Sequence, residues 1–200
     1  IVLHADKVIF HANSVTGLVE SLVGLVPGGG GVKETLYRWF DRTGEAGKSA
    51  WKTFMQVGYG RTASSPVVAR ELAMFRDGVD EFVMNRDRML DRAVRAVKEL
   101  SGAYRVERRE PIPMAGREAW VEMQAWLEEA REAGRLTPHD VTTGTQIAMI
   151  ATGGDVGQGA ELSEDDILAL ERKAFLALAK TPETRARIEH MLNYGSPLRN

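Results

Sequence analysis

One carboxylate, Glu20, stands alone in the otherwise uncharged, largely apolar stretch from Leu18 to Val26, which ends at Pro27 and four glycines, Gly28 to Gly31. Burial would disfavour the charged carboxylate and raise its pKa, which is how enzymes bring a glutamate near neutrality for acid–base catalysis. The glycines let the backbone approach a ligand closely and lead into a helix whose free N–H groups favour negative charge. From spacing alone, a solvent-exposed glutamate on an edge strand, followed by a flexible loop, is the commoner arrangement.

Two other glycine-containing segments could bind phosphate, and the residues argue against both. Gly47-Lys48-Ser49 ends like a phosphate-binding loop, but Arg42 occupies the position where that loop needs its first glycine, and a helix precedes it instead of a strand. The segment therefore predicts a helix start with an exposed lysine. Gly153 to Gly159 reverses the glycine order of the dinucleotide fingerprint and predicts a loop between helices.

Composition narrows the class of protein. The 200 residues are 44% hydrophobic and 27% charged with a net charge of −2, which suits one domain, or a small domain with an appended helical region, and gives no reason to expect a nucleic-acid partner. The chain has no cysteine, and its four histidines lack metal-binding spacing, so we expect no metal. No apolar run reaches the roughly 20 residues of a membrane span, and no signal peptide is visible, which predicts a soluble cytoplasmic protein.

The elements that would position Glu20 are mainly helical, with a short β portion in residues 1–26. Val8-Ile9-Phe10 predicts a strand. Helices are predicted from Val32 onward, over 50–57, over 66–74 and over 82–100, the last with a buried stripe of Phe82, Leu90, Val94 and Val97. In the last third, Thr137-Pro138, Ser163 and Thr181-Pro182 predict helix starts, and Gly134 and Gly195 predict helix ends. A polar connection over 101–114 predicts a boundary between domains 1–105 and 106–200.

Residues 17–31 resemble the segment of crotonase (enoyl-CoA hydratase/isomerase) enzymes that carries the second catalytic glutamate. That segment has a glutamate, a glycine four residues later, and Pro-Gly-x-Gly-Gly from the seventh residue. The matching positions are Glu20, Gly24, Pro27, Gly28, Gly30 and Gly31. Val19 departs from the proline that often precedes the glutamate, and Gly29 makes the loop looser. The likeness extends over about residues 1–100, with 4–10 similar to the strand after the family's first catalytic glutamate.

Residues 110–200 resemble the tail of long bacterial 3-hydroxyacyl-CoA dehydrogenases that carry a crotonase module. The similar segments are 171–175, 190–192 and 195–200. This resemblance implies that Asn200 is a true chain end, whereas the apolar start Ile1-Val2-Leu3 indicates the interior of a longer polypeptide.

The resemblance implies the C-terminal half of a crotonase-like ββα-spiral domain, followed by a helical region, in a β-oxidation enzyme. Glu20 would be one of two acid–base groups that add water to a 2-enoyl-CoA, and Gly24, Pro27, Gly28, Gly30 and Gly31 would bind the substrate. The other glutamate and the oxyanion donors would lie upstream of Ile1, so this fragment alone would be inactive.

It would bind no cofactor itself; NAD would serve the parent's dehydrogenase part. Expected partners are an acyl-CoA, the missing N-terminal part of the polypeptide and further copies of the chain. Isomerisation is open beside hydration, and the alternative function is a non-catalytic helical interaction or oligomerisation region.

Overall fold

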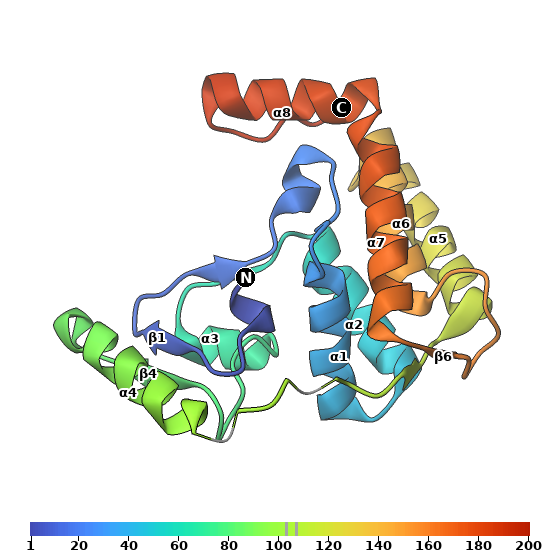
Figure 1. The fold of residues 1–200 in the computed structure, drawn as a ribbon. Coiled ribbons are helices and arrows are strands. Elements are labelled where there is room, and N and C mark those ends of the chain that lie inside the picture. Colours follow the sequence, from blue (N-terminus) through green and yellow to red (C-terminus); the bar gives the residue numbers. More distant parts are fainter. Residues whose placement is uncertain (103, 107) are drawn as a thin grey trace. The chain divides into compact units, whose positions relative to one another are not determined.

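The computed structural model describes residues 1–102, 104–106 and 108–200 and divides the chain into two compact units (Figure 1). Unit 1 contains Ile1–Gly17 and Thr62–Arg109, and unit 2 contains Leu18–Arg61 and Glu110–Asn200. Glu20 and the glycine-rich segment therefore belong to the same unit as the C-terminal helices. The expected domains, 1–105 and 106–200, stay a prediction.

Unit 1 is built on short strands and helices. Strand β1 pairs in parallel with β4, with Phe10 opposite Phe82, and β2 pairs antiparallel with β3. Its elements are the 3-10 helix η1 (Val2–His4), β1 (Ile9–His11), β2 (Thr16–Gly17), β3 (Thr62–Ala63), α3 (Pro66–Glu71), β4 (Glu81–Val83), the 3-10 helix η3 (Arg86–Arg88) and α4 (Met89–Ser101).

One buried carboxylate ties the start of unit 1 to its later segment. Asp80 accepts hydrogen bonds from the backbone N–H of Val8 at 2.9 Å and of Arg76 at 2.8 Å. The Arg76 guanidinium pairs with the same carboxylate at 2.8 Å and donates to the carbonyl of Ala5 at 2.9 Å. Because two strands of three residues are marginal by themselves, these contacts add to the pairing of β1 with β4.

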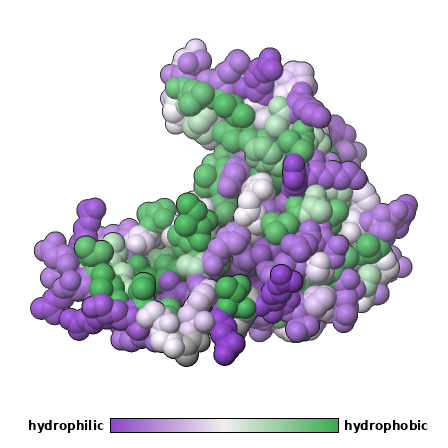
Figure 2. Space-filling view, in the orientation of Figure 1, coloured by the Kyte–Doolittle hydropathy of each residue, from purple (hydrophilic) through white to green (hydrophobic). Residues whose placement is uncertain are grey.

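The predicted helix over 82–100 is wrong at its start and in its stripe. Phe82 lies in β4, and the helix begins only at Met89. Leu90 is 73% exposed and Val97 is 64% exposed, so the stripe faces solvent in this unit, and hydrophobic residues lie among hydrophilic ones on the surface over α4 (Figure 2). The 3.6-residue period correctly predicted a helix with one apolar face. It could not predict whether that face packs against another part of the chain.

Unit 2 is a helical assembly in which α6 packs against α2, α5 and α7. Its elements are the 3-10 helix η2 (Glu20–Val23), α1 (Gly31–Thr43), α2 (Ala46–Gly58), β5 (Ile112–Pro113), α5 (Gly116–Glu132), α6 (Pro138–Thr152), β6 (Glu161–Leu162), α7 (Glu164–Ala179) and α8 (Pro182–Tyr194). Strand β5 pairs antiparallel with β6, with Ile112 opposite Leu162. The core of this unit is apolar and continuous, with Val26, Met123, Ile147 and Ile167 fully buried.

The caps of the last three helices confirm the helix starts and the last helix end that were predicted from the sequence. Thr137, Ser163 and Thr181 each accept a backbone N–H with their hydroxyl, and the first two form complete capping boxes with Asp140 and Asp166. Gly195 ends α8 in the left-handed region, at φ 66°. These short-range signals were readable because each cap is satisfied within its own few residues.

The fold class predicted from the sequence is confirmed in its coarse form, since the structure is mainly helical with short strands. The crotonase-like spiral stays a prediction. Among the described residues, no helix combines the length and the apolar character needed to cross a membrane.

Candidate functional site

Glu20 opens the 3-10 helix η2, so the expectation of a β portion in residues 1–26 is wrong at this point. Its side chain is half-buried, and Oε2 is buried without a hydrogen-bond partner among the residues described. The carbonyl oxygen of Glu20 accepts the N–H of Leu25 at 3.0 Å, which closes the turn. A carboxylate oxygen without a partner in a fixed turn is a candidate acid–base group, and this role stays a prediction.

Gly24 ends this turn, and its contacts require a glycine. Its φ is 76°, and an added Cβ would lie 2.7 Å from Nε2 of His139 and 3.0 Å from Oγ1 of Thr184. The Thr184 hydroxyl donates to the Gly24 carbonyl at 2.8 Å, and His139 Nε2 lies 2.9 Å from the same hydroxyl oxygen. Because a carbonyl only accepts, the hydroxyl proton goes to Gly24, and Nε2 of His139 must carry the proton of the second bond. We name these three residues the Gly24 cluster.

Burial lowers the pKa of His139, and the nearby positive charge of Arg187 lowers it further. The ring is therefore kept neutral with its proton on Nε2, as the hydrogen bond to Thr184 requires. The Gly24 cluster thus holds the Glu20 turn without using a charge.

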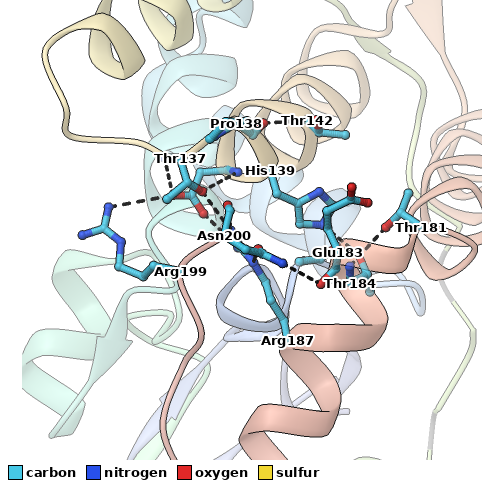
Figure 3. Close-up of polar contacts among 12 residues, drawn as sticks. Thr137, Pro138, His139, Thr142, Thr181, Glu183, Thr184, Arg187, Arg199 and Asn200 are labelled. Carbon is cyan, nitrogen blue, oxygen red and sulfur yellow. Dashed lines mark hydrogen bonds and ion pairs between the residues drawn. The ribbon is translucent and has the colours of Figure 1, made fainter.

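Arg187, buried on α8, connects that helix to the start of α6 (Figure 3). Its guanidinium donates to Oδ1 of Asn200 at 2.7 Å and to Oγ1 of Thr137 at 3.0 Å, and it pairs with Asp140 at 2.8 Å. Although burial acts to raise the pKa of Asp140, hydrogen bonds from Thr137 and Arg187 outweigh it and hold that pKa below its ordinary value. Asp140 therefore stays ionised, and the pair fixes α8 beside the Gly24 cluster.

The glycine-rich segment leads into the N-terminus of α1, where a carboxylate of the chain already occupies the anion position. Glu171 on α7 accepts the N–H of Gly30 at 2.7 Å and the N–H of Lys33 at 2.5 Å. Its side chain is fully buried. We name Gly30, Lys33 and Glu171 the Gly30 cluster. The sequence led us to expect free N–H groups here, and the structure shows that two of them are bonded internally.

Burial raises the pKa of Glu171 to about 7, although the N–H groups of Lys33 and Gly30 act to lower it. The ammonium of Lys33 pairs with Glu34 and Glu164, both at 2.7 Å, rather than with Glu171. Sequence reasoning missed Glu171, although a signal existed: it occupies one position of the buried α7 stripe formed by Ile167, Glu171, Ala174 and Leu178. A charge within an apolar stripe indicates a buried, bonded side chain.

Two more of the predicted substrate-binding residues, Gly28 and Gly31, lie where an added side chain would collide with a neighbour. A Cβ on Gly28 would lie 2.8 Å from the ring of Phe175, and one on Gly31 would lie 2.7 Å from Cβ of Pro27. Gly29, in contrast, has nothing within 4 Å of that position in the described chain. The structure thus places Glu20, Gly24, Pro27, Gly28, Gly30 and Gly31 in one continuous segment of unit 2. Their catalytic and substrate-binding roles stay predictions.

The other two glycine-containing segments fold as the sequence analysis expected. Helix α2 starts at Ala46, and Lys48 is exposed and pairs with Glu45 at 2.5 Å. Gly153 to Gly159 form the loop between α6 and β6. Among the residues that the structure describes, no group of three histidine or acidic side chains is arranged to hold a metal ion.

Comparison with known proteins gives one informative relative. No family model matches the chain. A probable 3-hydroxyacyl-CoA dehydrogenase of Bacillus subtilis (strain 168) is 32% identical over 199 residues, which are 99% of this chain and 25% of that protein. The chain thus spans a quarter of the length of its relative, and over that quarter it is similar to a probable 3-hydroxyacyl-CoA dehydrogenase.

Proposed function

We propose that this chain is part of the enoyl-CoA hydratase/isomerase module of a 3-hydroxyacyl-CoA dehydrogenase that acts in fatty-acid oxidation. The observation that carries the proposal is Glu20, whose buried Oε2 has no partner in the described chain and whose turn is fixed by the Gly24 cluster. The similarity to the Bacillus subtilis protein supports the dehydrogenase link. The register from Glu20 to Gly31 supports the hydratase/isomerase part.

In the favoured reaction, water adds across the 2,3 double bond of an enoyl-CoA. The oxygen of water bonds to C3, one water proton is taken up by a carboxylate, and a proton is delivered to C2. The negative charge rests meanwhile on the thioester oxygen. Glu20 performs one of these proton transfers, because its free oxygen can both accept and return a proton. The second glutamate and the N–H donors to the thioester oxygen come from residues upstream of Ile1.

NAD belongs to the dehydrogenase part of the parent polypeptide in this proposal. The loop from Gly153 to Gly159 does not fit a dinucleotide, since it follows a helix rather than a strand. The acyl-CoA thioester is the substrate of the Glu20 site.

The test is crotonyl-CoA hydration by the parent enzyme carrying Glu20→Gln. We expect kcat to fall by roughly 10²- to 10⁴-fold, since a positioned acid–base group contributes about that much. Glu45→Gln is the matched control, because Glu45 is exposed and pairs with Lys48. NAD-linked oxidation of 3-hydroxybutyryl-CoA by the same preparation should be unchanged. Full hydration activity in Glu20→Gln would refute the proposal, and a 3-enoyl-CoA substrate in parallel distinguishes isomerisation from hydration.

A non-catalytic interaction role is the second candidate, and the exposed apolar face of α4 favours it. Sedimentation of the chain would show self-association that Leu90→Ser and Val97→Ser abolish together. If that association exists while Glu20→Gln leaves hydration intact, the interaction role replaces the catalytic one.

A further inference from the structure

A pocket of about 370 Å³ lies within unit 2, next to the turn that carries Glu20 but on residues that the proposed chemistry does not use. It is bounded by η2, α2, α5, α6 and the C-terminal segment 197–199. Its volume falls in the range of sites that bind small molecules, roughly 300–1000 Å³. Most of its wall is apolar, and the main contributors are Phe54, Met55, Trp126, Leu127, Ile147 and Leu198.

Two hydroxyl groups in this wall have no hydrogen-bond partner among the described residues. Ser21 and Thr143 are 8% and 3% exposed, and neither Ser21 Oγ nor Thr143 Oγ1 has a hydrogen bond to any described residue. A buried hydroxyl without a partner costs free energy, which native proteins normally avoid. Two such groups lining one cavity therefore indicate that acceptor atoms of a bound molecule belong there.

The charges around the pocket favour an anion. Arg135, Arg187 and Arg199 line it together with a single acidic residue, Asp140. Arg187 and Arg199 both pair with Asp140, at 2.8 Å and 3.9 Å, so three guanidinium groups share one carboxylate and positive charge is in excess around the pocket. Arg199 donates to the carbonyl of Arg135 at 2.9 Å, and the Arg135 guanidinium lies 5.8 Å from the centre of the Trp126 ring. Both arginines are thus held beside the apolar wall.

We propose that this pocket binds an apolar monoanion of medium chain length. Its hydrocarbon body lies against Phe54, Trp126 and Ile147, its acceptor oxygens receive hydrogen bonds from Ser21 and Thr143, and its negative charge faces Arg135 and Arg199. A free fatty acid supplies this charge as its carboxylate, whereas the acyl end of a thioester is uncharged, so a thioester serves as the contrasting probe. The inference does not depend on hydration at Glu20.

Isothermal titration of the chain with octanoate, octanoyl-CoA and 1-octanol tests the proposal. Octanoate should bind at least tenfold more tightly than 1-octanol, because 1-octanol lacks the charge that the arginines attract. Tighter binding of octanoate than of octanoyl-CoA supports a free carboxylate as the ligand, and the reverse order overturns the monoanion assignment. Absence of binding by all three probes at millimolar concentration overturns the proposal.

Thr143→Val should weaken octanoate binding roughly tenfold while leaving thermal stability equal or higher, because the hydroxyl has no bond to lose in the free protein. The matched control is Thr152→Val on the same helix, since the Thr152 hydroxyl donates to the carbonyl of Ala148 at 2.8 Å. That control should lower stability and spare binding.

Gly58→Leu should block the pocket. Gly58 lines it, and a Cβ there meets nothing within 4 Å, so the added side chain has room. Gly47→Leu is the control, because Gly47 lies on the same helix outside this pocket and is equally open. Octanoate affinity that is unchanged in both Gly58→Leu and Thr143→Val would show that the anion binds elsewhere and would overturn the proposal.

Discussion

The Gly24 cluster and the Gly30 cluster fix the two ends of the segment between Glu20 and α1, and they do so with different chemistry. The Thr184 hydroxyl donates to the Gly24 carbonyl, and His139 donates in turn to the Thr184 hydroxyl, so this end is held by neutral hydrogen bonds. Glu171 holds the N–H groups of Gly30 and Lys33 through a buried carboxyl group. One end is held at a carbonyl by a hydroxyl donor, and the other is held at two N–H groups by a carboxyl acceptor.

The two clusters consequently respond to pH with opposite sign. His139 has a lowered pKa, so its neutral form contributes stability that is lost as the pH falls. Glu171 has a raised pKa, so its protonated form contributes stability that is lost as the pH rises. The two ends of one segment therefore respond oppositely to pH. Burial penalises the charged imidazolium of His139 at one end and the charged carboxylate of Glu171 at the other.

The largest effect should come from Glu171→Ala. This change leaves the N–H groups of Gly30 and Lys33 without an acceptor in a buried place, and we expect a loss of about 3–4 kcal/mol in unfolding free energy. Urea unfolding at mildly acidic pH measures it. Glu171→Gln, which keeps one acceptor oxygen, should lose less than half as much. Equal losses in the two variants would show that the bonds to the α1 N-terminus contribute little.

The pH dependence of stability gives the second test. The folded pKa of Glu171, about 7, lies above its ordinary value of 4.5, so the folded chain retains a proton that the unfolded chain releases. The stability from neutral Glu171 is complete below pH 4.5 and is lost as the pH rises through 7. The wild-type chain should lose up to about 3 kcal/mol relative to Glu171→Gln across this window. A constant difference between the two proteins from pH 4.5 to above 7 would contradict the assignment.

Gly28→Ala should have the third effect. Its Cβ would lie 2.8 Å from the Phe175 ring, so α7 or the loop has to move, at a cost of about 2 kcal/mol. Gly29→Ala is the matched control, since that position is open, and it should change stability by less than about 0.5 kcal/mol. Thermal unfolding of both variants decides the point. Equal stability would mean that the loop relaxes freely away from α7.

The smallest effect should come from Thr184→Val. The Gly24 carbonyl loses its donor and His139 loses its acceptor, for about 1 kcal/mol. Thr142→Val provides the control, because the Thr142 hydroxyl is exposed and bonds only within its own helix. Thr184→Ser should restore most of the loss. If it does not, packing of the Thr184 methyl group, and not the hydroxyl, holds the turn.

Local signals predicted a large part of the fold. The caps at Thr137, Ser163 and Thr181 were read correctly because a cap depends on residues three positions apart. The 82–100 prediction failed because Phe82 pairs with Phe10 in a parallel strand, and no local pattern reports a partner so distant in sequence.

The site was predictable only in part, for the same physical reason. Glu20 and the glycine register were visible as residue types in a fixed order. The partners that satisfy this segment, Thr184 and Glu171, lie on α8 and α7. The apolar stripe of α7 indicates that Glu171 is buried, but no local pattern tells which backbone groups these two side chains bond. The hydroxyls of Ser21 and Thr143 look like ordinary polar residues until the structure shows that nothing pairs with them.

The bond from Thr184 to Gly24 joins residues 160 positions apart, and the bond from Glu171 to Gly30 joins residues 141 apart. During synthesis, at roughly 5–20 residues per second, the Glu20 turn leaves the ribosome several seconds before either partner exists. Contacts this distant also slow folding, since a long loop has to close before they form. The Glu20 turn therefore acquires its fixed shape among the last events in the maturation of unit 2, after α7 and α8 have been made.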